Sequence, residues 1–216
     1  MGFASLFSQN RPETMIVRAG DDPADVLPFS YRYLNKDYKD GYLAFQLGVK
    51  SGVYKFNFDL LSGKLTFINE KKDTMVVQED VTVKYLHLGK DVYYHDVTQG
   101  FFKILSKDTL CMLTSHIEFT HYVPTNVGYG TVKHKTTAIA TASRGQEQTF
   151  ERTLKFHLID RRGSISSFAD KTTFLKMFHT DEDNIKTFIK ENKISFRDEK
   201  DLVRLFEYCH SLGVNQ

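Results

Sequence analysis

The chain has 216 residues, which is long enough for one substantial domain or for one domain with a small appendage. Hydrophobic residues make up 41% and charged residues 26%, the balance of an ordinary soluble globular protein. The formal net charge of +2 gives no whole-chain electrostatic reason to expect binding to nucleic acid or to an anionic membrane.

Residues 1–10 read MGFASLFSQN and have features of the end of a secretory signal peptide. Apolar residues precede Ser8, which is small enough for a cleavage point, and Leu6 lies two positions before it. A basic start and a full apolar core are missing, so an ordinary flexible terminus is the alternative interpretation. The signal-peptide interpretation predicts that the mature chain works outside the cytoplasm. No apolar run approaches ~20 residues, so the sequence predicts no transmembrane segment.

Residues 11–41 have no regular pattern and are predicted to form an N-terminal arm. Pro23 and Pro28 punctuate the segment as loop residues do, whereas residues 15–17 fit one short strand. Tyr31 and Tyr33 fit packing along an edge of the main sheet.

Residues 42–168 are predicted to form an antiparallel β domain. Between residues 54 and 60, aromatic and aliphatic side chains alternate with polar ones, which is typical of a strand with one buried face. Turn signals such as Ser62-Gly63 recur with no helical pattern between them, and this favours a meander that forms a sandwich or an open barrel. A later strand from Phe150 is predicted to pair with residues 110–119. The predicted fold class is therefore α+β, mainly β.

Residues 120–148 break the alternation and are predicted to form a long loop rich in Thr, Gly, Ala and Ser. A structureless segment of this length inside a domain is either disordered or functional. One interpretation is therefore disorder or a tolerated insertion, and the other is an ordered loop that binds a partner. The second interpretation assigns partner binding to a mostly basic set of side chains: Tyr129, Lys133, His134, Lys135 and Arg144.

Residues 169–213 change to a helical period and are predicted to form about three helices that cap the sheet. Their apolar stripes have the width that packs one face of a helix against a core. Thr180 and Asp198 are predicted N-caps, because their side chains can accept hydrogen bonds from the first backbone N–H groups of a helix. Gly213 fits the left-handed position that often ends a helix.

The residues that carry chemistry form no recognisable catalytic, cofactor or metal motif. Cys111 and Cys209 are the only cysteines, and they read as two buried free thiols or, in an oxidising compartment, as a disulfide. The histidines are scattered through the predicted sheet and its loop: His87, His95, His116, His121 and His134. The sequence therefore predicts no catalytic residue, no metal site and no cofactor.

Several passages together carry a resemblance to known proteins. They are SLFSQN at residues 5–10, GFFKIL at 100–105, FHLID at 156–160, FLKMF at 174–178, IKTFIKENK at 185–193 and the apolar pattern of 201–208. With these passages the chain resembles a group of uncharacterised exported proteins of the Bacteroidetes type. The resemblance implies a periplasmic or outer-membrane-associated location and the fold described above. It implies no functional residues.

These observations favour a non-catalytic cell-envelope protein, an accessory or interaction subunit that binds another envelope or outer-membrane protein and no nucleic acid. One alternative is a carrier of a small apolar ligand or lipid, with a pocket in the β domain lined by residues such as Phe56, Phe58 and Leu154. A hydrolase with histidines gathered in space is the remaining alternative. The sequence leaves open the identity of the partner, the oligomeric state, the pairing of the thiols and the closure of the sheet.

Overall fold

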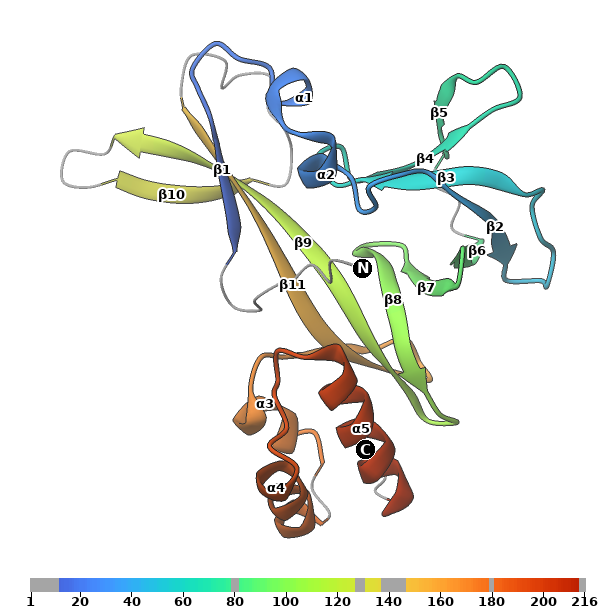
Figure 1. Cartoon of the computed structure of the whole chain (residues 1–216), viewed down its shortest axis with the longest axis vertical. Helices are drawn as coiled ribbons and strands as arrows, with labels where there is room; N and C mark the ends of the chain where they lie inside the picture. The colour runs from blue at the N-terminus through green and yellow to red at the C-terminus, as the bar shows by residue number, and fades with distance from the viewer. Residues whose placement is uncertain (1–11, 79–81, 127–130, 137–146, 179–180, 214–216) are drawn as a thin grey trace, which may run out of the picture. The chain divides into compact units, whose positions relative to one another are not determined.

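The structure is a computed structural model that describes residues 12–78, 82–126, 131–136, 147–178 and 181–213 (Figure 1). For residues 123–126 and 131–136 it describes the backbone alone. Within these ranges the chain forms one 12-stranded sheet, and its strand order is β1-β11-β9-β8-β7-β6-β2-β3-β4-β5, with β10 paired to β9 and β12 paired to β11. The predicted mainly β fold with an open antiparallel sheet and C-terminal helices is confirmed.

The strands and helices follow the turn signals of the sequence. The first half of the chain forms β1 (Glu13–Val17), α1 (Pro23–Val26), α2 (Phe29–Arg32), β2 (Lys39–Phe45), β3 (Tyr54–Asp59), β4 (Lys64–Ile68), β5 (Thr74–Val76), β6 (Val83–Leu88), β7 (Asp91–Asp96) and β8 (Gly100–Lys107). The second half forms β9 (Cys111–Asn126), β10 (Thr131–Thr136), β11 (Gln148–Asp160), β12 (Ile165–Phe168), α3 (Lys171–Leu175), α4 (Glu182–Glu191) and α5 (Glu199–Ser211). No helix in these ranges is long and apolar enough to cross a membrane.

The chain divides into two compact units. Among the described residues, the first unit contains residues 101–116 and 154–213, and the second contains residues 12–100 and 117–153. The strands β9 and β11 each contribute residues to both units. The sequence predicted a division between a β domain and the helices at residue 168, whereas by contacts the helices share a unit with β12 and with parts of β8, β9 and β11.

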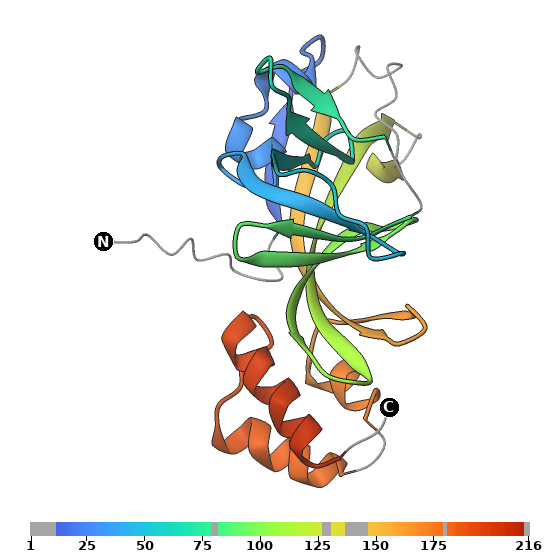
Figure 2. The same ribbon diagram turned by 90° about the vertical axis from the view of Figure 1, so that its right-hand side faces the viewer.

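The first unit is built around helices that pack on strand residues. Its core joins Cys111, Leu113, Phe156 and Leu158 of the strands to the apolar stripes of α3, α4 and α5. Figure 2 shows α4 and α5 beside each other, and the rings of Phe188 and Tyr208 stack between them with centroids 4.0 Å apart.

The ends of these helices test the predicted caps. The Asp198 side chain accepts hydrogen bonds from the backbone N–H groups of Lys200 and Asp201, so this N-cap is confirmed. Gly213 has the expected positive φ of 67°. Thr180 lies outside the described residues, and the N-cap of α4 is Asp181, which itself has a left-handed backbone.

In the second unit, the segment around α2 connects β1 and β11 with β3. The Tyr31 hydroxyl lies 2.8 Å from the carbonyl oxygens of both Glu13 in β1 and Phe150 in β11. Three residues later in the chain, Leu34 N–H donates to the Phe58 carbonyl of β3. The N-terminal arm is therefore an integral part of this unit.

The Arg32 guanidinium and the Asp59 carboxylate form the strongest polar contact in this segment. Two charge-assisted bonds of 2.7 and 3.1 Å join them, and Asp59 is only 3% exposed. Asp59 also accepts from the N–H groups of Leu61 and Ser62, so its buried charge is fully surrounded by donors.

The structure places strands where the sequence predicted the loop of residues 120–148. β9 continues to Asn126, and β10 returns along it in an antiparallel hairpin. Thr and Val suit the extended backbone, so the composition that indicated a loop is equally compatible with strands. Residues 127–130 and 137–146 lie outside the described residues.

Removing the Asp59 carboxylate is expected to destabilise the second unit. In Asp59→Ala the guanidinium of Arg32 loses its partner, and we expect the free energy of unfolding to fall by about 3 kcal/mol in urea titrations. Asp40→Ala is the control, because Asp40 forms an exposed ion pair with Lys55 that is worth less than about 1 kcal/mol. Equal losses in the two variants would contradict this assignment.

Candidate functional site

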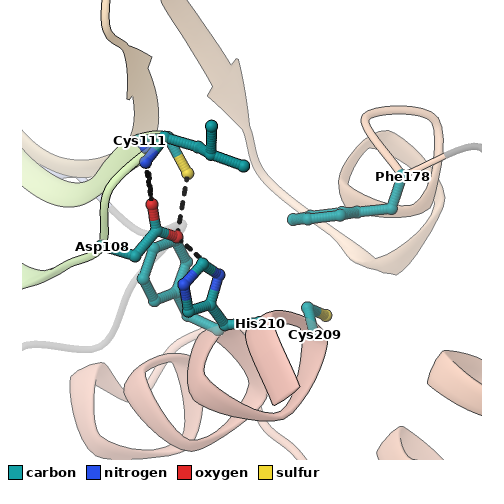
Figure 3. A pocket seen from close by; sticks show the side chains of 7 residues that line it. Asp108, Cys111, Phe178, Cys209 and His210 are labelled. Atoms are coloured by element: carbon teal, nitrogen blue, oxygen red, sulfur yellow. Dashed lines mark hydrogen bonds and ion pairs between the residues drawn. The ribbon is translucent and has the colours of Figure 1, made fainter. Parts of the chain in front are cut away.

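A small pocket lies in the first unit between the β8–β9 turn and α5 (Figure 3). Its walls are Asp108, Leu110, Cys111, Phe178, Phe206, Cys209 and His210. The cavity volume is about 10 Å³, which is enough for one water molecule. Pockets that bind organic ligands are roughly 300 Å³ or larger, so this pocket does not support the carrier alternative.

The side chains in this pocket bring together a thiol, a carboxylate and an imidazole. The Oδ2 atom of Asp108 lies 2.8 Å from Nδ1 of His210 and 3.8 Å from Sγ of Cys111 (Figure 3). The other carboxylate oxygen accepts hydrogen bonds from the backbone N–H groups of Leu110 and Cys111. Asp108 therefore fixes its own turn and joins it to the C-terminal end of α5.

The order of these groups does not fit nucleophilic catalysis. A reactive cysteine needs an imidazole or another positive charge beside its sulfur, whereas the group next to Cys111 is a carboxylate. Burial and the charge of Asp108 raise the pKa of Cys111 to about 12, and burial raises the pKa of Cys209 to about 12. Both cysteines are free thiols in the structure. This pocket is a packing and capping arrangement.

Both thiols are expected to be inert in the folded protein. Their raised pKa values leave almost no thiolate at pH 8, so we expect the native chain to react with a disulfide reagent at least about 100-fold more slowly than the chain unfolded in guanidinium. Absorbance of the released aromatic thiol measures this rate. Rapid native labelling of Cys111 would contradict the assignment, and Cys209→Ala separates the two sites.

The histidines predicted from the sequence lie in separate environments. His87 stacks on Tyr42, and Nδ1 of His95 lies 3.0 Å from the Val83 carbonyl. His116 stacks on Phe102 in the first unit, with ring centroids 4.6 Å apart. His134 belongs to β10, where the backbone alone is described. Within the described ranges, no group of three or more His, Cys, Asp or Glu residues is arranged to hold a metal ion.

One buried histidine was not singled out by the sequence patterns. His157 is on β11, and its Nδ1 lies 2.9 Å from Oγ of Ser167, its cross-strand neighbour on β12. The His157 and Phe102 rings pack edge to face, with their centroids 5.1 Å apart. Residues 156–159 are all buried, so both faces of β11 are covered there, and a period-two pattern cannot reveal that.

His121 lies in the second unit, where it is 5% exposed and stacks on Phe150 with centroids 4.8 Å apart. Burial lowers the pKa of His121 below its ordinary value near 6.5. The unfolded chain therefore takes up a proton at a higher pH than the folded chain does. The resulting contribution to stability is complete above pH 6.5 and is lost as the pH falls from there toward the folded pKa.

Replacing His121 is expected to flatten the pH dependence of stability. Between pH 7 and 5, the wild-type free energy of unfolding should fall with a His121 contribution of at most about 1.4 kcal/mol per pH unit. His121→Phe keeps a stacking ring and removes the titration, so its slope in urea titrations should be smaller. A variant slope equal to that of the wild type would show that His121 does not titrate as the burial predicts.

The structure places part of the predicted partner-binding set on β10. Lys133, His134 and Lys135 pair in register with Pro124, Val123 and Tyr122 of β9. Tyr129 and Arg144 lie outside the described residues. Partner binding by this hairpin therefore stays a prediction.

A second surface feature is the connection between β2 and β3, residues 46–53, called here the β2–β3 tip. It holds Leu47, Val49 and Val53 at exposed fractions of 94%, 60% and 70%. Backbone hydrogen bonds between the tip and the end of β2, such as Phe45 N–H to Val49 O at 2.9 Å, make it an ordered turn. Ser51 strengthens it, since its hydroxyl accepts from Leu43 N–H. Three exposed aliphatic side chains in one eight-residue turn make the tip a candidate contact surface.

A third feature is the side of β5 that pairs with no other described strand, called here the β5 edge, at the end of the strand order. Every residue of β5 is exposed, and Met75 and Val76 are 45% and 48% exposed. Val77 N–H donates to Leu65 O and Asn69 N–H to Asp73 O, so odd-numbered residues from 73 to 77 face β4. Thr74 and Val76 consequently direct their N–H and C=O groups away from β4.

Comparisons with known proteins identify no relative: no family model, curated protein or solved structure matches the chain. The proposals for this protein therefore rest on the β2–β3 tip, the β5 edge and the sequence.

Proposed function

We propose that the protein is a non-catalytic accessory subunit of the cell envelope that binds another envelope protein at the β5 edge. The observation that carries this proposal is the pair of outward-facing backbone groups of Thr74 and Val76 at the end of the sheet. An extended segment of a partner can add there as the next antiparallel strand.

The side chains of the β5 edge suit such a strand. Met75 lies opposite Phe67 in β4, which in turn lies opposite Phe56 in β3. The three side chains form one apolar row across the strands, and their exposure increases from the buried Phe56 to the exposed Met75. An added strand with an apolar residue opposite Met75 would extend this row and remove it from water, so side-chain pairing would supplement the backbone bonds.

The envelope location and export by a signal peptide belong to the same proposal. They are supported by the pattern of residues 1–10 in the sequence, which lie outside the described residues. Binding at an edge strand requires no catalytic group.

A proline at position 76 is expected to block strand addition and leave the fold intact. Val76 directs its N–H away from β4, so Val76→Pro removes a hydrogen bond to the partner and none to β4. Tagged wild-type protein incubated with solubilised envelope should retain a stoichiometric partner, and the variant should lose at least about 90% of it, as expected when a strand-addition hydrogen bond and its register are lost. Mass spectrometry of the bound fraction measures this loss.

Two controls make this experiment decisive. Gln78 lies after β5, so Gln78→Pro leaves the outward N–H and C=O groups of Thr74 and Val76 unchanged. This variant should therefore retain the partner. Circular dichroism must show equal melting of both variants. Equal capture by Val76→Pro and wild type would refute the β5 edge as the binding site, and the absence of any stoichiometric partner would refute the accessory-subunit function.

A further inference from the structure

The β2–β3 tip has a chemical pattern that the proposed function does not use. Between residues 41 and 58 the chain has two lysines, Lys50 and Lys55, and no acidic residue. The three exposed aliphatic side chains, Leu47, Val49 and Val53, lie within the same stretch. The tip therefore combines apolar surface with positive charge, although the chain as a whole is nearly neutral.

The cation of the tip is held beside an aromatic ring. The Lys50 ammonium lies 5.1 Å from the centroid of the Tyr42 ring, which stacks on His87 at 4.4 Å. Burial and the nearby Lys50 charge lower the pKa of His87, so its imidazole is neutral at neutral pH. Lys50 is thus the charged member of this stack, while Lys55 is paired with the exposed Asp40.

The residue types favour a bilayer over a protein groove as the occupant of this surface. Hot spots in protein interfaces are enriched in Trp, Tyr and Arg, and Leu and Val are under-represented there. The acyl region of a bilayer instead accepts aliphatic side chains without requiring a complementary shape. Lysine and tyrosine suit the boundary beside it, since the ammonium reaches the phosphates and the tyrosine ring tolerates both phases.

We propose that the β2–β3 tip inserts Leu47, Val49 and Val53 into the surface of a bilayer with anionic headgroups, with Lys50 contacting the headgroup phosphates. The contact buries a few side chains only, so it is a reversible anchor that acts together with a second attachment. This inference concerns a different surface from the β5 edge, and it holds or fails independently of the proposed function.

A single tryptophan provides a specific reporter, because the chain has none. Leu47→Trp places the fluorophore at the tip, and Val97→Trp places it at another exposed apolar position, 58% exposed, in the β7–β8 turn. With vesicles of phosphatidylcholine and phosphatidylglycerol, the emission of Leu47→Trp should shift to shorter wavelength and be quenched by brominated acyl chains. The emission of Val97→Trp should not change, nor should that of Leu47→Trp with phosphatidylcholine alone.

Vesicle sedimentation of chains without tryptophan tests whether the native side chains suffice. Leu47→Ser combined with Val49→Ser should lower the partition coefficient on anionic vesicles about tenfold or more, because the burial of aliphatic area is lost. Val97→Ser should leave the coefficient unchanged, and Lys50→Glu should lower it.

Each contrary outcome overturns the proposal. No wild-type sedimentation with anionic vesicles, or sedimentation that the tip variants do not change, excludes insertion of the tip. Loss of a stoichiometric envelope protein from Leu47→Ser, with no wavelength shift for Leu47→Trp, would assign the tip to a protein groove. Because Val76→Pro tests the β5 edge separately, failure of one idea is distinguishable from failure of the other.

Discussion

The bidentate contact between Arg32 and Asp59 holds the second unit in register. Asp59 ends β3, and Arg32 ends the short helix α2, so their pairing fixes the N-terminal segment to β3, which is third from the β5 end of the strand order. A buried carboxylate with one partner removed is costly, which makes this contact difficult to replace singly. The strands that carry both proposed surfaces, β2 to β5, are neighbours of this contact in the strand order.

A second polar anchor supports the same strand. The Asn57 side chain is fully buried, accepts from Asn35 N–H and donates to the Asn35 carbonyl. Thr66 of β4 donates to the Asn57 carbonyl and contacts the Tyr38 hydroxyl. One face of β3 and β4 is therefore held by satisfied hydrogen bonds, and the other by the apolar row through Phe56. Because both faces of β3 and β4 are fixed in this way, the β2–β3 tip and the β5 edge can stay exposed to water.

The sequence predicted most of the elements because their periodicity is strong. The strand at residues 54–59, the cap at Asp198 and the turn at Gly63 each depend on local preferences, and each is present. The expected single buried face of that strand is not observed, because Asn57 and Asp59 are buried by polar partners while Tyr54 is 38% exposed. The loop prediction for residues 120–148 was wrong where β9 and β10 form, since Thr-rich segments suit both strands and loops. The two units are not visible in the sequence pattern, because β9 and β11 are continuous in sequence and periodicity cannot show which neighbours each part of them meets.

The candidate surfaces were less predictable than the fold. The sequence showed that open sheet edges invite strand addition, yet it did not identify β5, because edge position depends on the order of all strands. Leu47, Val49 and Val53 read as ordinary hairpin residues. Their exposure depends on the hydrogen bonds that turn residues 46–53 outward, and these involve Thr82 of a distant segment.

The pairing of β1 with β11 has a consequence for synthesis of the chain. Glu13 lies opposite Arg152, so β1 cannot pair with β11 until nearly all of the strands have been synthesised. At the usual pace of translation this interval is about 10 to 30 s. During it, Met15 and Val17 lack Phe150, the member of their apolar cluster that β11 supplies. The pairing of β1 can therefore be completed only after residue 152 has been synthesised.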